Sequence, residues 1–442
     1  MELFKLFDKL HEYIGHHGAI MFFTFGFFLL GGVLLVSPQP TVVSSHPKFS
    51  ATYIVGSFAM LLPAVVGIVV LTFRSHRKGR QIQVIAWKGW DDEEIYGHFK
   101  RTLPDFLLYE RGFDTVPRVT YRSDEFDVLV CDIEFLHRYH KSKQLADLAP
   151  LGAISDLWQK TIPIIRQKAR VACQSDDGRI LLGIPIQFGF QEILVNPTSF
   201  TGDFRAILTE APATHQSKVS YSDFKLLDLL TKTNALIGIW NWYLPALSLL
   251  QLTEGVSLGD VSKAPGHVEE ITRFLCDPTH RSRFVLLNRL ESVSQALEDG
   301  TVGVVLGAGS WAIPVNNSAQ ARIKPIVPRE GLLMFINCAT VLNSADAAPV
   351  RAVPLIQHWR NCRTQSKLCD NNTFRAIPVT QESFNELYGG THAHPSLFTL
   401  TAMLTKDGEA HDTSKISLRE LPTGWRHWQE CWERVEAALR VL

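Results

Sequence analysis

The stretch IQVIAWKGWDDEE, residues 82–94, begins as a short, mostly apolar run and ends on two tryptophans and an acidic cluster. A short apolar run of this kind is typical of a strand that helices cover on both faces. Trp87 and Trp90 follow it directly, three residues apart, where they cannot both be core. In open α/β sheets, ligands bind outside the carboxyl ends of the strands. We therefore expect the two indoles to line a ligand cleft.

The chain after Arg80 repeats this order of apolar strand, loop and amphipathic helix. FDVLVC and VGVVLGAG have the composition of buried strands, and WRHWQECWERVEAAL has helical spacing of its apolar residues. Alternating strands and helices predict an α/β body with a largely parallel sheet. The length of residues 79–442 suits two lobes better than one.

The charge balance and the cysteine count give no indication of nucleic-acid binding or of a disulfide-stabilised fold. The 442 residues contain 44 Lys and Arg and 44 Asp and Glu, so no net field attracts nucleic acid. The seven cysteines are scattered and odd in number, which does not indicate a disulfide framework. Isolated thiols are the simpler interpretation, and a Cys362–Cys369 bridge is the alternative in an oxidising compartment.

Two uncharged apolar runs near the N-terminus predict a transmembrane hairpin. The runs, 19–37 and 51–73, each reach or exceed the roughly 18 residues that distinguish a spanning helix from a core helix. A signal peptide does not explain the second run. Residues 1–18 have apolar residues at helical spacing and predict an amphipathic helix on the lipid interface, with a partner-docking helix as the alternative.

The distribution of Lys and Arg predicts the orientation of this hairpin. Basic residues lie before the first run and after the second, and the connecting loop has only Lys48. Positive charges stay in the cytoplasm. We therefore expect a two-pass protein of a bacterial inner membrane, with its body on the cytoplasmic face. The basic residues on which this depends are Lys5, Lys9, Arg74, Arg77, Lys78 and Arg80.

Aromatic, acidic and amide side chains recur at the predicted strand ends. Such a composition suits a small cationic or amphipathic solute, held by ring faces and carboxylates. The alternative is that several of these rings are ordinary core at helix–sheet junctions. Besides Trp87 and Trp90, the candidate ligand-binding residues are Asp132, Glu134, Phe188, Trp240, Phe335 and Asn337.

The sequence gives little support for catalysis. It contains no G-x-x-x-x-G-K-[ST] motif that would cradle nucleotide phosphates, and Ser310 in GAGSW follows the second glycine instead of lying between two. His11 and His16 in HEYIGHH are five residues apart, where a zinc helix has four. We predict no enzyme activity, no metal and no cofactor.

Several segments, in order, resemble one family of binding proteins. VIAWKGW at 84–90, FDVLVCDIEF at 126–135, GIPIQFG at 183–189 and VPREGLLMFINCATVLNSADA at 327–347 are each loose matches. Together they resemble the polyamine-type (spermidine/putrescine) solute-binding proteins of ABC transporters, which have the type 2 periplasmic-binding-protein fold. The resemblance covers most of residues 80–390.

This resemblance implies a two-lobed receptor that closes on a small molecule by a hinge and works with a membrane permease. Trp87 and Trp90 would form one wall, and Asp132 and Glu134 the polar end. Phe188, Trp240 and Phe335 would form the facing surface.

Two features of the chain depart from the family. Asn337 stands where the family commonly has the Asp that meets an ammonium group, so a less charged ligand becomes an alternative. Family members work on the periplasmic face, which conflicts with the charge distribution. A second hypothesis is therefore a degenerate binding fold used as a membrane-attached scaffold or interaction module, without a role in transport.

Overall fold

The computed structural model describes residues 82–85, 106–109, 126–141, 143–174, 179–210, 218–313, 322–343, 348–361, 364–365, 377–389 and 396–442. The chain divides into two compact units, Met1–Gln81 and Ile82–Leu442, and every described residue belongs to the second. The predicted leader at 1–18, the predicted spans at 19–37 and 51–73, and the tryptophans Trp87 and Trp90 lie outside the described residues.

The predicted two-pass localisation in an inner membrane requires correction. Within the ranges that the structure describes, none of the helices combines the length and the apolar character needed to cross a bilayer.

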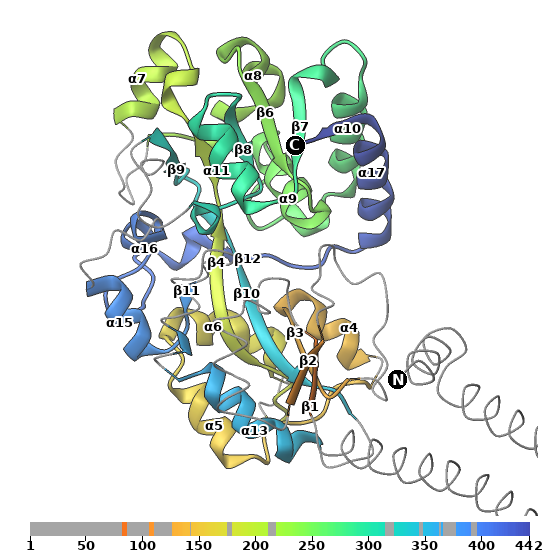
Figure 1. The fold of residues 1–442 in the computed structure, drawn as a ribbon, viewed down its shortest axis with the longest axis vertical. Coiled ribbons are helices and arrows are strands. Elements are labelled where there is room, and N and C mark those ends of the chain that lie inside the picture. Colours follow the sequence, from red (N-terminus) through yellow and green to blue (C-terminus); the bar gives the residue numbers. More distant parts are fainter. Residues whose placement is uncertain are drawn as a thin grey trace, which may run out of the picture. The chain divides into compact units, whose positions relative to one another are not determined.

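The first of two sheets has seven strands in the order β11-β4-β10-β3-β1-β2, with β12 beside β10 (Figure 1). β1 pairs in parallel with β2 and β3, whereas β10 runs antiparallel to both β3 and β4. The strands are β1 (Ile82–Ile85), β2 (Phe106–Tyr109), β3 (Val128–Asp132), β4 (Ile184–Gln191), β10 (Leu332–Val341), β11 (Ile377–Pro378) and β12 (Ile416–Leu418).

The second sheet has six strands in the order β13-β7-β6-β8-β5-β9. Four of these six strands, β13, β7, β6 and β8, run parallel to one another. β5 runs antiparallel to both β8 and β9. The prediction of a largely parallel sheet is therefore met only in part, because strands that pass between the sheets enter each one antiparallel to a neighbour. The strands are β5 (Ile193–Val195), β6 (Leu236–Trp240), β7 (Phe284–Leu287), β8 (Val302–Leu306), β9 (Lys324–Ile326) and β13 (Arg440–Val441).

Each sheet has its own helices (Figure 1). With the first sheet lie α4 (Leu136–Lys141), α5 (Gly152–Gln159), α6 (Pro163–Cys173), α13 (Ala348–Trp359) and α15 (Gln381–Gly389). With the second lie α7 (Gly202–Glu210), α8 (Leu226–Lys232), α9 (Tyr243–Thr253), α10 (Pro265–Cys276), α11 (Leu290–Glu298) and α17 (Trp425–Ala438). Helix α16 (Ser396–Met403) contacts β9 and the short 3-10 helix Ser310–Ala312.

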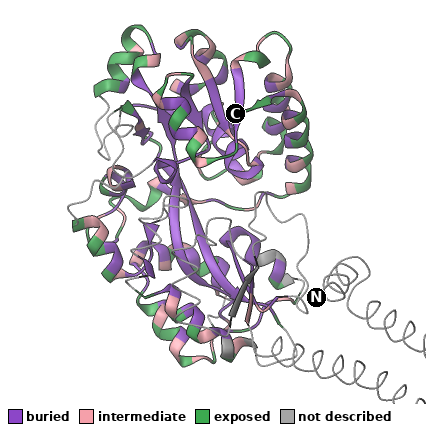
Figure 2. Cartoon of the chain, in the orientation of Figure 1, coloured by how far each residue is buried: buried purple, intermediate pink, exposed green. Residues whose placement is uncertain are grey.

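Burial follows the apolar pattern of the sequence. β4 and β10 are buried along their whole length (Figure 2), as is every residue of α9. Helix α17 buries one stripe, formed by Trp428, Cys431, Trp432 and Val435 at helical spacing. β4, β10 and α9 therefore lie in the core, and α17 packs against α9 and α10.

Three segments of the described chain connect the two sheets, which agrees with the predicted mixed α/β body. Glu192 joins β4 to β5, residues 327–331 join β9 to β10, and residues 419–424 join β12 to α17. In the second segment Gly331 has φ +109°, and a Cβ there would meet the Lys415 carbonyl oxygen at 2.0 Å. Only glycine fits that position, because the conformation is left-handed and the space is taken by backbone.

Candidate ligand-binding site

The strand register brings two distant strand ends together beside β10. β3 runs antiparallel to β10 and ends with Asp132 opposite Asn337. β12 runs parallel to β10 along the same edge and ends with Leu418 opposite Met334. The carboxyl ends of β3 and β12 therefore point at each other across the short stretch of β10 that neither covers, and the residues that follow each strand meet there.

Arg419, the residue after β12, joins the two acids at the end of β3. Its Nε donates a hydrogen bond to Glu134 Oε1 at 2.6 Å, and its Nη2 donates to the carboxylate of Asp132. The backbone N–H of Arg419 donates to the Met334 carbonyl at 2.8 Å, which fixes the start of the side chain. The side chains of Arg419, Asp132 and Glu134 are 2%, 2% and 0% exposed, so this is a fully buried ion cluster.

Aromatic rings complete the surroundings of the guanidinium. Its carbon lies 4.9 Å from the centre of the Trp242 ring and 5.6 Å from that of Phe335. Phe335 packs edge-on against Trp311, and Trp311 packs edge-on against Trp240. Because Trp240 and Trp242 come from the end of β6 and Phe335 from β10, the cluster joins both sheets.

One guanidinium cannot compensate two buried carboxylates fully. Burial, and then the charge of Glu134, raise the pKa of Asp132 well above its usual range, and Arg419 opposes this only in part. Burial also raises the pKa of Glu134. Burial disfavours the charged guanidinium as well, but the two acids outweigh it and raise the pKa of Arg419. Arg419 therefore stays protonated while the acids compete for it.

A row of amide side chains continues from this cluster across the first sheet. Gln187 on β4 lies opposite Asn337 on β10, which lies opposite Asp132 on β3, so the three side chains share one face. Gln191 lies on the same face of β4 as Gln187, four residues on. Both polar atoms of Gln187, Gln191 and Asn337 are buried and have no hydrogen-bond partner among the described residues.

Such groups are uncommon in folded proteins. Leaving a buried polar group without a partner costs about 1–3 kcal/mol, and most buried amides are bonded. Six such atoms on one face, next to a buried ion cluster, make this face the candidate ligand-binding site.

Glu192 holds one of the crossovers between the sheets. It is buried, its backbone N–H donates to Ala308 O at 2.9 Å, and its carboxylate accepts from the Ser310 N–H and the Thr399 hydroxyl. Burial raises the pKa of this carboxyl group. The residue therefore fastens the β4–β5 connection to the second sheet and to α16.

The structure brings five of the predicted site residues into one neighbourhood: Asp132, Glu134, Trp240, Phe335 and Asn337. Phe188 is completely buried and points to the other face of the sheet from Gln187, packing edge-on against Phe190. Trp87 and Trp90 lie outside the described residues.

Sequence reasoning missed Arg419. The available signal was a basic residue directly after ISL, a short stretch with two apolar residues, at the end of a strand as Asp132 is. Its acidic partner Glu134 lies 285 residues away in the chain, and no local pattern joins the two.

Solved structures share this fold at low sequence identity. A putative spermidine/putrescine ABC transporter from Listeria monocytogenes superimposes with a TM-score of 0.54 at 11% identity, covering 81% of this chain and 99% of that one. The TpPotD lipoprotein of Treponema pallidum gives 0.52 at 12% identity, covering 80% and 98%. The Atu4243-GABA receptor gives 0.52 at 12% identity, covering 81% and 97%.

A scan against protein-family models finds no match, and neither does a search of the curated proteins. The likeness is therefore one of structure, and it extends over nearly the full length of the solved proteins. The chain has the type 2 fold of the solute-binding proteins of ABC transporters, and the resemblance to their polyamine-type members that its motifs predict is confirmed at the level of the fold.

Proposed function

We propose that this protein is a solute-binding protein that closes two lobes over a small molecule. The observation on which this depends is the row of buried, unpartnered amides of Gln187, Gln191 and Asn337 beside the Arg419 cluster. A ligand that hydrogen-bonds these groups supports the closed arrangement, because it removes the cost of burying them. Binding energy would then bias the equilibrium toward the closed form.

The composition of the site favours an uncharged or zwitterionic solute. Asp132 and Glu134, which would meet an ammonium group, are already bonded to Arg419. Each of the three amides, on Gln187, Gln191 and Asn337, offers one carbonyl oxygen as acceptor and one NH2 group as donor. A small molecule with both hydroxyl or amide donors and carbonyl or carboxylate acceptors fits this set.

A polyamine fits the described site less well, although a cationic amine is what the sequence motifs predict. It would have to displace the guanidinium of Arg419 from both acids and from the rings of Trp242 and Phe335. The names of similar structures include spermidine/putrescine and GABA, which differ in charge, so the fold alone does not choose between these classes. We expect weak binding of spermidine and putrescine.

Isothermal titration of the full chain tests the proposal. The ligands are spermidine, putrescine, γ-aminobutyrate, neutral amino acids and small sugars. We expect heat with a neutral or zwitterionic member, and loss of that heat in Asn337→Leu, because the variant removes the amide without adding charge. Gln295→Leu, an exposed amide on α11, is the control and should leave binding unchanged. Equal binding by Asn337→Leu and the parent would refute the site.

The interaction module predicted as the second hypothesis is favoured by one observation. Arg419 occupies the place between acids and aromatic rings that an external cation would take. If no ligand in the panel produces heat, this alternative gains support.

A permease partner remains part of the solute-binding proposal, and crosslinking in the closed state would test it.

A further inference from the structure

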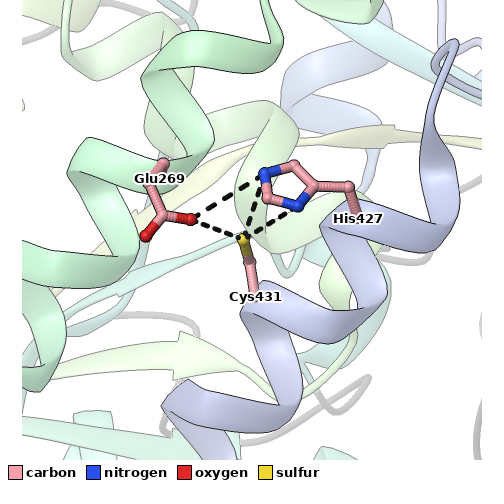
Figure 3. Close-up of side chains that lie close together, drawn as sticks. All are labelled: Glu269, His427 and Cys431. Atoms are coloured by element: carbon pink, nitrogen blue, oxygen red, sulfur yellow. Dashed lines mark hydrogen bonds and ion pairs between the residues drawn. The ribbon is translucent and has the colours of Figure 1, made fainter.

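Three side chains able to bind a metal ion meet between two helices that lie with the second sheet, apart from the residues of the proposed ligand site. Glu269 comes from α10, and His427 and Cys431 come from α17. Figure 3 shows the carboxylate, the imidazole and the thiol pointing toward one another across the space between the helices. Among the residues that the structure describes, they form a group whose ligand atoms all lie within 4.8 Å of one another.

The helical spacing explains how two of these groups share a face. His427 and Cys431 are four residues apart on α17, so they lie one above the other along the helix. Cys431 belongs to the buried stripe of α17, and His427 is half-exposed at its margin. The packing of α10 against this stripe then places Glu269 opposite both.

The distances among the three ligand atoms match those around a tetrahedral ion. Cys431 Sγ lies 3.3 Å from Glu269 Oε2 and 3.6 Å from His427 Nε2, and His427 Nε2 lies 3.8 Å from Glu269 Oε2. Bonds to Zn²⁺ of about 2.0–2.3 Å in tetrahedral geometry place neighbouring ligand atoms roughly 3.3–3.6 Å apart. A movement of a few tenths of an ångström would therefore suffice.

The donor set also selects the class of ion. A thiolate and an imidazole suit Zn²⁺ and similar transition metals, whereas Ca²⁺ and Mg²⁺ prefer oxygen ligands only. We propose that Glu269, His427 and Cys431 form a site for Zn²⁺ or a chemically similar divalent transition metal, with three protein ligands and a fourth position open to water.

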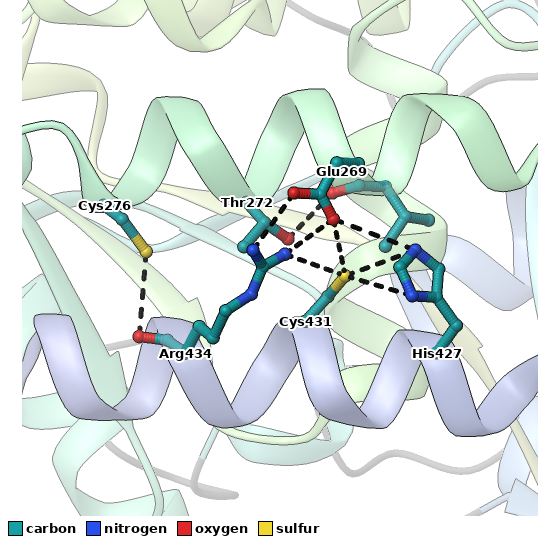
Figure 4. Close-up of polar contacts among 7 residues, drawn as sticks. Glu269, Thr272, Cys276, His427, Cys431 and Arg434 are labelled. Carbon is teal, nitrogen blue, oxygen red and sulfur yellow. Dashed lines mark hydrogen bonds and ion pairs between the residues drawn. The ribbon is translucent and has the colours of Figure 1, made fainter.

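Arg434 is the competing cation at this site (Figure 4). Its Nη1 donates to Glu269 Oε1 at 3.0 Å, and its Nη2 donates to Glu269 Oε2 at 2.6 Å and to Cys431 Sγ at 3.2 Å. The Arg434 side chain is 52% exposed, so it can withdraw from Oε2 and the sulfur at small cost. The contact with Oε1 would persist and orient the carboxylate toward the ion.

An ion held in this way would crosslink α17 to α10. Helix α17 begins at Trp425, soon after the crossover that starts with Arg419. Because the ion would bind the folded helix pair more tightly than the unfolded chain, its binding should raise the melting temperature.

Titration of the full chain with Zn²⁺, after treatment with a chelator, tests the proposal. We expect His427→Gln and Cys431→Ser each to bind one ion fewer than the parent, and Zn²⁺ to raise the melting temperature of the parent more than that of either variant. Co²⁺ should give the visible absorption of a tetrahedral thiolate site in the parent, and this absorption should be lost in both variants.

Cys276→Ser is the matched control. Cys276 is a thiol on α10 near Arg434, whose carbonyl oxygen it contacts at 3.7 Å, but it does not belong to the group of three (Figure 4). This variant should keep the full stoichiometry. His427→Gln changes a half-exposed side chain, so it tests the site even if Cys431→Ser does not fold. Unchanged Zn²⁺ stoichiometry in His427→Gln, or absence of binding in the parent, would overturn the proposal.

Discussion

The Arg419 cluster and the Arg434 cluster each join an arginine to a carboxylate, and they differ chiefly in their access to water. Around Arg419 the three charged side chains are at most 2% exposed, whereas Glu269 and Arg434 are 38% and 52% exposed. An exposed ion pair is worth at most about 1 kcal/mol, because water screens it and can replace either partner. A buried charge without its partner is far more costly. The first cluster is therefore fixed, and the second can exchange one cation for another.

The largest effect is expected from removing the buried cation. Arg419→Met would leave Asp132 and Glu134 buried without a partner and should lower the free energy of unfolding by about 3–5 kcal/mol. Urea denaturation followed by tryptophan fluorescence measures this. The triple variant that adds Asp132→Asn and Glu134→Gln should recover most of the loss, because it removes the uncompensated charges. A loss below 1 kcal/mol in Arg419→Met would contradict the buried pairing.

A smaller effect, of opposite sign, is expected in the amide row. Asn337→Leu replaces two unpartnered polar atoms with apolar ones of similar size, and should raise the free energy of unfolding by about 1–3 kcal/mol without ligand. The same variant should lose ligand binding, so stability and function should change in opposite directions. Thermal melts with and without ligand measure both. A destabilised Asn337→Leu would show that the amide has a partner in the folded protein.

The buried acids should also make stability depend on pH. Because burial and Glu134 raise the folded-state pKa of Asp132 above its unfolded value, the folded protein holds a proton that the unfolded chain releases. The contribution of this group to stability is complete below the unfolded pKa and is lost as pH rises through the folded pKa. Denaturation at several pH values should show that slope, and Asp132→Asn should reduce it. An unchanged slope in the variant would assign it to other groups.

The strand ends of the first sheet were predictable because continuous apolar runs mark buried strands, and polar residues directly after them are few. Asp132 and Glu134 were found in this way. Phe335 and Asn337 were also predicted at a strand end, but they lie inside β10, which continues to Val341. The direction of each strand was not predictable, because β4 and β10 are buried along their whole length, as parallel strands usually are, and yet run antiparallel to each other.

The partners of these residues were not predictable for a different reason. Arg419 follows a strand of only three residues, and its place beside β3 depends on the register of both strands along β10. In the second cluster, the spacing of His427 and Cys431 is visible in the sequence, whereas Glu269 joins them only through the packing of α10 on α17. Local patterns thus identify one side of each cluster, and tertiary packing supplies the other.

The smallest change in stability, and the sharpest contrast with Arg419, is expected from Arg434→Gln. Its half-exposed pair with Glu269 should contribute only about 0–1 kcal/mol to the free energy of unfolding. Removing the positive charge next to Glu269 and Cys431 should nevertheless tighten Zn²⁺ binding, because the ion no longer competes with the guanidinium for Glu269 Oε2 and the sulfur. Competition against a chelator of known affinity measures the change, with the exposed Arg426→Gln on the same helix as control. Weaker Zn²⁺ binding in Arg434→Gln would mean that the guanidinium supports the ion instead of competing with it, and the two clusters would then resemble each other more closely than their exposure to water indicates.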